Sequence, residues 1–407
     1  MLILCFFVLK TLVLVDCRFF FVILKVKGGK CTMKKITLYD YNQTVLFMHM
    51  FDVLISEKAV VQNVKKEALL KDLDINPSSF RRSRNDEKNV GKVIISKLSK
   101  YFGLKMIDHD YLQFLSKIIN DIYLDVNYRI DSKFDFYLEK LNELSIEKTI
   151  MFPVVDLFVL FLNVFAFTDL ETMIEKHRES FKNLSKYQLF FNNDLLSIYK
   201  MLELVFCKKL TSDLIFKCSD GISYSIIANR FRLEGNYVES VNYSRKAKEI
   251  FIQENNLKRI LQINFTMLNN LAHTHNFYSY YSLAEEQLFT LRSLGGNSIE
   301  YKNAIKHFVV SATALKKFDE VISVLEEQSE LTLTELFAFI VAKHNLDNDE
   351  FAIWYEKNVL NNDCLKEHYN DIDALRCYLE TNSKKYLSKL NENKIVMDSF
   401  IEVMKLA

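Results

Sequence analysis

The scarcity of glycine and proline is the feature that most constrains how this chain can fold. Only 8 Gly and 2 Pro occur in 407 residues. These two residue types mark the tight turns that a chain of many short strands needs at close intervals. Apolar residues make up 49% and charged residues 26% of the chain, which is typical of a globular protein with a large core. The sequence therefore predicts an all-α protein, and its length predicts two or three structural units.

The formal net charge of +1 hides an asymmetry along the chain. Residues 33–105 contain 14 Lys and Arg against 8 Asp and Glu, a balance of +6. Residues 106–407 contain 34 basic against 43 acidic side chains, a balance of −9. The small N-terminal part is therefore basic and the large remainder acidic.

The motifs that mark common catalytic sites are absent, and the residues that could bind a metal are badly spaced. The seven cysteines are scattered and none is spaced as CxxC, which indicates neither disulfides nor a zinc module and fits a reducing cytoplasm. No GxxxxGK[ST], GxGxxG, HExxH or GxSxG motif occurs. His273 and His275 stand two apart and would point to different sides of a helix, a poor arrangement for a metal. We expect no enzyme activity, no metal and no cofactor.

Residues 1–32 are hydrophobic but do not read as a membrane segment. Lys10, Asp16, Arg18 and Lys25 interrupt the apolar residues before a run of about 20 is reached, the length that a spanning helix needs. A signal peptide would need a basic start and a small-residue cleavage site, and both are missing. The codons of Gly28-Gly29-Lys30 can form a ribosome-binding sequence. We therefore expect translation to start at Met33, with a genuine hydrophobic extension or anchor as the alternative.

The basic part of the chain predicts several short helices. Apolar residues recur at helical spacing between Tyr41 and Lys58, and a shorter amphipathic stretch runs from Lys66 to Leu73. Asn76 then suits a helix N-cap, and Pro77 suits the first helical position, where its missing N–H has no partner to lose. A new helix is therefore predicted to start at once, followed by a polar break and a further helix through Phe102.

Two short helices joined by a tight turn are typical of a helix-turn-helix, whose second helix enters the major groove of DNA. With Ile75 and Phe80 packed inward, the polar side chains that follow would face outward. Arg can bond guanine in bidentate fashion, whereas Ser and Lys mostly bind phosphates. The candidate DNA-binding residues are Ser78, Ser79, Arg81, Arg82, Arg84 and Lys92.

The stretch from Ala68 to Leu104, ALLKDLDINPSSFRRSRNDEKNVGKVIISKLSKYFGL, resembles the Xre-type helix-turn-helix. The resemblance implies that the small residues after the turn and the polar residues of the third helix face DNA. One departure is that Asp86-Glu87 stand where a glycine usually ends the recognition helix. A solvated basic helix face with no DNA partner is the alternative interpretation.

The acidic part contains an internal repeat. The segment SYSIIANRFRLEGNYVESVNYSRKAKEIF resembles a tetratricopeptide repeat through Ala228, Phe231, Gly235, Tyr237, Tyr243 and Ala247, with Ser240 where the family usually has Ala. The outline returns around His275-Asn276-Phe277 and twice more, which places aromatic residues at intervals of 40, 41 and 33 residues: Tyr237, Phe277, Phe318 and Phe351. Helix hairpins of this length stack to bury their apolar faces, so a right-handed superhelix with a concave groove is predicted.

The resemblance also implies a ligand face. Asn229 and Asn269 stand six residues before Gly235 and His275, at a position that points into the groove of tetratricopeptide domains and often binds peptide backbone. Arg232 and Thr266 lie one helical turn away, and four further polar residues are expected to be their neighbours, with an ordinary wet surface as the alternative. The candidate peptide-binding residues are Asn229, Arg232, Gln262, Thr266, Asn269, His273, Lys306 and His307.

The longest apolar run after Met33 is FPVVDLFVLFLNVFAF, within residues 146–168. It is too short and too interrupted to span a bilayer. A buried helix that packs between repeats is therefore predicted, with Pro153 in its first turn.

A basic helix-turn-helix followed by tetratricopeptide-like repeats resembles the RRNPP-type peptide-pheromone regulators, which include the Rgg and PlcR-like proteins. The resemblance implies a cytoplasmic homodimer that binds a palindromic double-stranded DNA operator and an oligopeptide or protein effector, without a membrane. We expect a DNA-binding domain at 33–105, linker helices at 106–145 and the repeat domain at 146–407. An interaction adaptor, or a regulator of a signalling enzyme without sequence-specific DNA binding, is the alternative.

Overall fold

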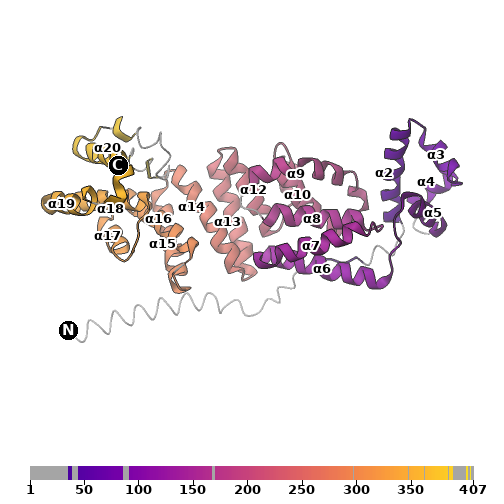
Figure 1. Ribbon diagram of the computed structural model, residues 1–407, viewed down its shortest axis with the longest axis horizontal. Helices are drawn as coiled ribbons and strands as arrows, with labels where there is room; N and C mark the ends of the chain where they lie inside the picture. Colours follow the sequence, from indigo (N-terminus) through magenta and orange to yellow (C-terminus); the bar gives the residue numbers. More distant parts are fainter. Residues whose placement is uncertain are drawn as a thin grey trace. The chain divides into compact units, whose positions relative to one another are not determined.

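The computed structural model describes residues 35–38, 45–85, 91–166, 170–296, 298–346, 348–361, 363–383, 385–387, 400–401 and 404 (Figure 1). Regular structure in these residues is helical, apart from one isolated parallel bridge between Lys105 and Thr149. The predicted all-α class is therefore confirmed. Residues 1–32 and Asp86-Glu87, about which the sequence made predictions, lie outside the described residues.

The chain divides into two compact units. The first holds the described residues up to Ile227 together with Glu249–Arg259, and the second holds Ala228–Lys248 and the described residues from Ile260 onward. The helices of the first unit are α2 (Val45–Gln62), α3 (Lys66–Asp72), α4 (Pro77–Asn85), α5 (Lys92–Phe102), α6 (His109–Tyr128), η2 (Asp131–Lys133), α7 (Phe134–Ile146), α8 (Phe152–Ala166), α9 (Leu170–Ser185), η3 (Gln188–Phe190), α10 (Asn193–Phe206) and α11 (Ser212–Phe216).

Three helices have residues in both units: α12 (Gly221–Leu233), α13 (Tyr237–Gln253) and α14 (Leu257–His273). The remaining helices belong to the second unit alone. They are α15 (Phe277–Ser293), α16 (Ile299–Ala314), α17 (Phe318–Glu326), α18 (Leu333–Leu346), α19 (Asn348–Tyr355), η4 (Glu356–Leu360), η5 (Asp363–His368) and α20 (Tyr369–Thr381).

Helices α2 to α5 form a small group around a shared apolar core (Figure 1). The first helix ends four residues later than the predicted span of 41–58, and residues 41–44 of that span lie outside the described residues. Helix α3 ends one residue before the predicted Leu73, and α4 starts at Pro77 as predicted. The long helix α2 contacts each of the other three. The buried apolar side chains of the group include Phe51, Ile55, Leu70, Ile75, Phe80, Ile95 and Leu98.

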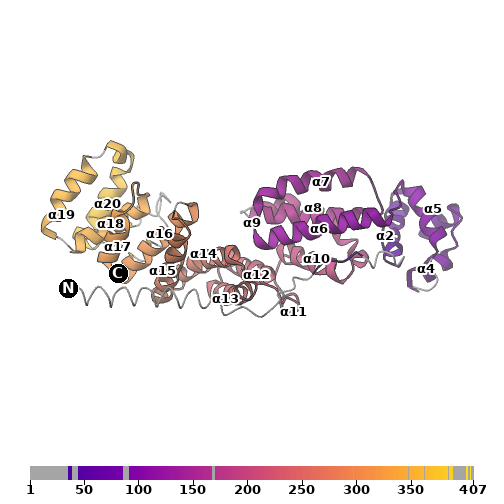
Figure 2. The same cartoon turned by 90° about the horizontal axis from the view of Figure 1, so that it is seen from below.

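The long apolar run forms α8, at the centre of the remaining helices of the first unit. It packs against α6, α7, α9 and α10, and Figure 2 shows α6, α7 and α8 running alongside one another. Pro153 is its second residue and Phe158 and Phe161 are fully buried. The predictions of a buried helix and of proline in its first turn are confirmed. The helix packs chiefly against helices that precede the repeat pairs, not between repeats as predicted. A helix enclosed by four others must be apolar around most of its surface.

Helix pairs in the second unit follow the repeat that the sequence predicted. Tyr237, Phe277 and Phe318 are each the first residue of a helix, α13, α15 and α17. The residue two positions earlier is left-handed in every case, with φ of 74° at Gly235, 55° at His275 and 58° at Lys316. Phe351 departs from the pattern because it lies inside α19, which begins at Asn348. Three helix pairs therefore share the same left-handed turn before their second helix, and this turn accounts for the repeated pattern in the sequence.

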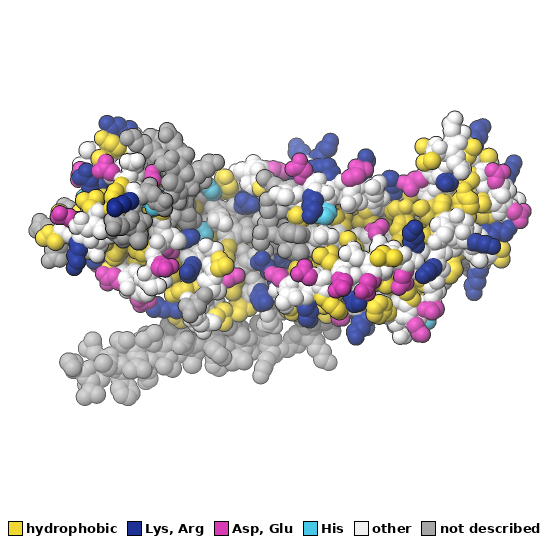
Figure 3. Space-filling view, viewed as in Figure 1, with side chains coloured by type: hydrophobic (Ala, Val, Ile, Leu, Met, Phe, Trp, Pro, Cys, Tyr) yellow, Lys and Arg dark blue, Asp and Glu magenta, His cyan; other side chains and the backbone are white. Residues whose placement is uncertain are grey.

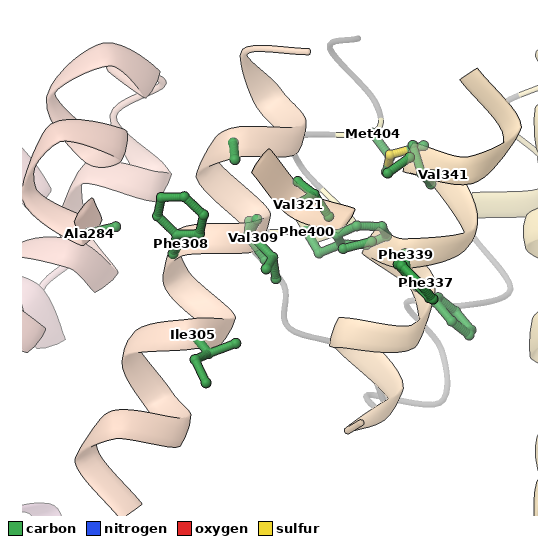
Figure 4. Close-up of a cluster of buried hydrophobic side chains, with 14 of the residues drawn as sticks. Ala284, Ile305, Phe308, Val309, Val321, Phe337, Phe339, Val341, Phe400 and Met404 are labelled. Carbon is green, nitrogen blue, oxygen red and sulfur yellow. The ribbon is translucent and has the colours of Figure 1, made fainter. Parts of the chain in front are cut away.

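The core of the second unit joins these pairs to the C-terminal helices. Figure 4 shows side chains of α16, α17 and α18 meeting residues from near the end of the chain. The rings of Phe337 and Phe400 meet edge to face with centroids 6.4 Å apart. The hydroxyl of Tyr378 donates to the backbone carbonyl of Met404 at 2.7 Å. The described C-terminal residues therefore close the apolar face that α18 would otherwise expose.

Candidate nucleic-acid interface and peptide-binding face

Asn76 starts α4 and thereby decides which side chains the helix presents. Its Oδ1 accepts a hydrogen bond from the backbone N–H of Ser78 at 2.9 Å, and its carbonyl accepts from the N–H of Phe80 at 3.0 Å. The Ser78 hydroxyl also donates to Oδ1 of Asn76, at 2.7 Å. The predicted cap is confirmed, since a side-chain oxygen satisfies an N–H group that has no partner within the helix.

One face of α4 is polar and open to solvent. Ser78, Arg81, Arg82 and Asn85 are exposed, and their spacing of three, four and seven residues places them on one side of a helix. Phe80 and Ser83 are buried on the opposite side. Helix α4 contains no acidic residue, so this face, which we call the α4 outer face, carries only positive charge.

The turn before α4 is tied to the helix that follows it. Asp74 is left-handed with φ of 52°, a conformation that Asp tolerates better than most residues. Nζ of Lys97, on α5, donates to the Asp74 carbonyl at 2.9 Å and to Oδ2 at 2.7 Å. The hydrogen bond from Lys97 lowers the pKa of the Asp74 carboxyl. These bonds hold the turn between α3 and α4 against α5.

Arg84 lies on a different side of α4 from Arg81 and Arg82. Its Nη1 is 3.1 Å from Oδ2 of Asp52 on α2, and Nζ of Lys66 on α3 contacts Oδ1 of the same carboxylate. Asp52 therefore joins three helices and neutralises charge that would otherwise face outward. Burial and the nearby Arg84 lower the pKa of His49 on α2.

The other predicted DNA-binding residues flank the α4 outer face. Ser79 is partly exposed, and Lys92 is the exposed first residue of α5. Figure 3 shows Lys and Arg side chains over the surface of the α3–α5 end of the first unit. The sequence analysis did not identify Asp52 and Lys66, because their roles depend on how the helices pack. The one local signal was an acidic residue between the apolar residues Phe51 and Val53 of α2.

Four of the predicted peptide-binding residues share one face of α14. Gln262, Thr266, Asn269 and His273 are spaced by four, three and four residues and lie on the less buried side of the helix. Asn269 and His273 are exposed, and the His273 ring stacks on Tyr237 of α13 with centroids 4.4 Å apart. We call these four residues the α14 face.

Buried hydrogen bonds link the residues next to Asn229 and Asn269, the two asparagines that the repeat indicates. Asn270 donates from Nδ2 to the hydroxyl of Ser240 at 2.6 Å, and Ser240 donates to the carbonyl of Ala228 at 2.6 Å. Ser240 thus links the residues that adjoin Asn229 and Asn269, and its small side chain lets α12, α13 and α14 approach. Asn229 is partly exposed on α12, where Arg232 is exposed one turn later.

His307 does not lie on an open surface with the other predicted peptide-binding residues. It is 5% exposed, and its Nδ1 is 2.9 Å from the hydroxyl of Tyr280. Burial, with a smaller effect of Lys306, lowers the pKa of His307 to about 4. The structure therefore places His307 in the core between α15 and α16, whereas Lys306 beside it on α16 is partly exposed.

Neither a metal site nor a membrane span is evident in the part of the chain that the structure describes. No three His, Cys, Asp or Glu side chains among these residues gather closely enough to bind a metal ion. None of the described helices combines the length and the apolar character that crossing a bilayer requires.

Comparison of the chain with models of known protein families, with curated proteins and with solved structures found no match.

Proposed function

We propose that this protein is a DNA-binding transcription regulator whose second unit receives an effector, which we take to be a signalling oligopeptide. The observation that carries the proposal is the α4 outer face: a capped short helix after a tight turn, with two exposed arginines on one side and its apolar side in a core. A helix held in this way can place arginine side chains against base edges in the major groove.

In this proposal α3, the turn and α4 act as an Xre-type helix-turn-helix. The protein works in the cytoplasm as a homodimer on a palindromic operator, since two such helices related by a two-fold axis read two half-sites. The resemblance to the RRNPP-type regulators supports this assignment. The role of Ser78 is narrower than that of the arginines, because its hydroxyl already donates to Asn76.

The helix pairs of the second unit would stack as a right-handed superhelix and bind the peptide on the α14 face together with Asn229. Amide side chains suit an extended peptide, because each presents a donor and an acceptor to the peptide backbone. The peptide would regulate the protein by binding its active and inactive arrangements unequally, which is the only way a ligand can shift such an equilibrium.

Selection of DNA from a random duplex library with the purified full-length protein tests the first half of the proposal. We expect an enriched palindrome, and Arg81→Ala or Arg82→Ala should weaken its binding by roughly 1 to 3 kcal/mol if the side chain reads a base. Arg178→Ala removes the same charge from an exposed position on α9 and should leave affinity unchanged. Failure to enrich any DNA sequence would favour an interaction adaptor. Equal DNA affinity in all variants would show that α4 is not the recognition helix.

A pooled library of short synthetic peptides, with binding read by native mass spectrometry, tests the second half. The wild type should retain a subset of peptides that the double variant Asn229→Ala and Asn269→Ala loses. Asn242→Ala, at an exposed position on α13, is the matched control and should retain them. Retention by the double variant would place the effector site elsewhere.

A further inference from the structure

Residues Lys35–Leu38 lie against the first unit without being part of any helix. Ile36 and Leu38 are each 3% exposed, while Thr37 between them is partly exposed. Alternation of this kind is that of an extended chain, in which side chains two apart point the same way. The segment thus inserts two aliphatic side chains into the unit and leaves the residue between them near the surface.

Side chains, not a neighbouring strand, satisfy the backbone of this segment. Oδ1 of Asn120, on α6, accepts from the N–H of Ile36 at 2.9 Å, and its Nδ2 donates to the carbonyl of Ile36 at 2.8 Å. A single amide side chain thereby pairs with both backbone groups of one residue. This is the donor and acceptor pattern that an adjacent β-strand would offer.

The next residue is held at the start of α10. Oδ2 of Asp194 accepts from the backbone N–H and from the hydroxyl of Thr37, both at 3.1 Å. Nδ2 of Asn192 donates to the carbonyl of Thr37 at 2.8 Å. Asn192 is 7% exposed and its Oδ1 also caps α10 by accepting from the N–H of Leu195 at 3.0 Å, so its orientation is determined before the segment binds.

We propose that Asn120, Asn192 and Asp194 form a clamp for the backbone of an extended chain that carries two aliphatic residues separated by one residue, here Thr37. Its occupant is the segment Lys35–Leu38 of the same molecule. All four hydrogen bonds to backbone groups use atoms that every non-proline residue has, so the selectivity comes from the two aliphatic side chains and from the Thr37 hydroxyl, which also donates to Asp194.

The clamp anchors the α2–α5 group. Six residues separate Leu38 from Val45, the first residue of α2, and they span at most about 25 Å when fully extended. A second attachment lies within α2 itself. The ring centroids of Phe47 and Phe190 are 5.8 Å apart, and Oε1 of Glu57 lies 2.7 Å from Nζ of Lys186. Release of the segment would remove one of these two attachments and allow α2 larger movements. Only the consequence of such movements for operator binding rests on the proposed function.

Hydrogen exchange in the full-length protein tests the clamp without DNA. Asn120→Ala removes the partner of Ile36, and Asn192→Ala removes the partner of the Thr37 carbonyl. If the clamp releases as a unit, each variant should speed exchange about tenfold at the amide that it does not touch, Thr37 in the first case and Ile36 in the second. A tenfold change corresponds to about 1.4 kcal/mol, within the range that a lost buried hydrogen bond costs. Exchange within α2 should also rise.

Matched variants separate release of the segment from general loss of structure. Asn163→Ala removes a side chain that makes the same kind of bond to a helix carbonyl, to Val159 at 2.8 Å, and should leave Ile36 and Thr37 protected. Asp194→Asn keeps an acceptor for the Thr37 amide, so this amide should stay protected from exchange in that variant. In Asp194→Ala the Thr37 amide should exchange faster. The proposal would be overturned if exchange became faster only at the amide whose own partner was removed, or if the exchange rates within α2 did not change.

Discussion

Nη1 of Arg84 lies 3.1 Å from Oδ2 of Asp52, so the last arginine of α4 is bound to α2 rather than presented with Arg81 and Arg82. The same carboxylate also pairs with Lys66 on α3. One acidic residue thus sets both the packing of three helices and the number of positive charges that the group shows to solvent.

Replacement of Asp52 should have opposite effects on stability and on DNA affinity. Asp52→Ala removes two partly exposed ion pairs and leaves Lys66 and Arg84 unpaired, which should lower the free energy of unfolding by about 1 kcal/mol. Freed cations should at the same time strengthen non-specific DNA binding and steepen its dependence on salt. Urea unfolding and binding titrations at several salt concentrations measure the two effects. Asp72→Ala removes an equal charge from an exposed position at the end of α3 and is the control; weaker DNA binding by Asp52→Ala would contradict this account.

Loss of the cap on α4 should weaken the helix without changing its charge. Asn76→Ala should lower the free energy of unfolding by about 1 kcal/mol, because the N–H of Ser78 loses its acceptor. Asn76→Ser keeps a capping oxygen and should lose less than half as much. Chemical unfolding followed by circular dichroism makes the comparison, and equal losses in the two variants would show that the cap does not stabilise α4.

The buried imidazole of His307 should make the second unit sensitive to acid. Its folded-state pKa of about 4 lies below the value of 6.5 expected in the unfolded chain. The unfolded state therefore binds more protons between these values, and stability falls as the pH decreases from about 6.5 to about 4. Between pH 7 and pH 5 this residue should account for a loss of about 2 kcal/mol.

His307→Gln removes the titrating group and should flatten that part of the pH profile, measured as the difference in unfolding free energy from the wild type. His273→Gln, at an exposed position, is the control. Identical profiles for the wild type and His307→Gln would show that the imidazole is not held neutral in the core.

The left-handed turns between helix pairs offer a direct test of backbone strain. Lys316 adopts φ of 58°, which a side chain disfavours and glycine does not. Lys316→Gly should raise the free energy of unfolding by roughly 0.5 to 1 kcal/mol. Lys302→Gly, at an exposed position inside α16, should lower it by about 1 kcal/mol because glycine weakens a helix interior. The same sign for both changes, measured by urea unfolding, would mean that the turn is not strained.

The parts of the fold that depend on near neighbours could be predicted from the sequence. Asn76 and Pro77 together predict the start of α4, and Ile75 and Phe80 were expected to be buried and are. The scarcity of glycine and proline predicted the all-α class. Tyr237, Phe277 and Phe318 each begin a helix because the turn before them uses the same backbone conformation whether it holds Gly, His or Lys.

Features that depend on distant contacts could not be predicted. Arg84 and Arg82 are equally basic in the sequence, and only the approach of α2 decides that one of them is paired. His307 follows Lys306 on the same helix, and which of the two is buried depends on the position of Tyr280. The clamp joins Ile36 to Asn120, which lies 84 positions further along the chain, and Thr37 to Asp194, which lies 157 positions further. No periodicity in either stretch of sequence indicates these contacts.

That separation has a consequence for the order of events during synthesis. Thr37 leaves the ribosome 157 residues before Asp194, an interval of roughly 8 to 30 seconds at about 5 to 20 residues per second. Helices α2 to α5 are completed well within this interval. The α2–α5 group is therefore synthesised in full before Asn192 and Asp194 exist, so the clamp can close only many seconds after this group has left the ribosome.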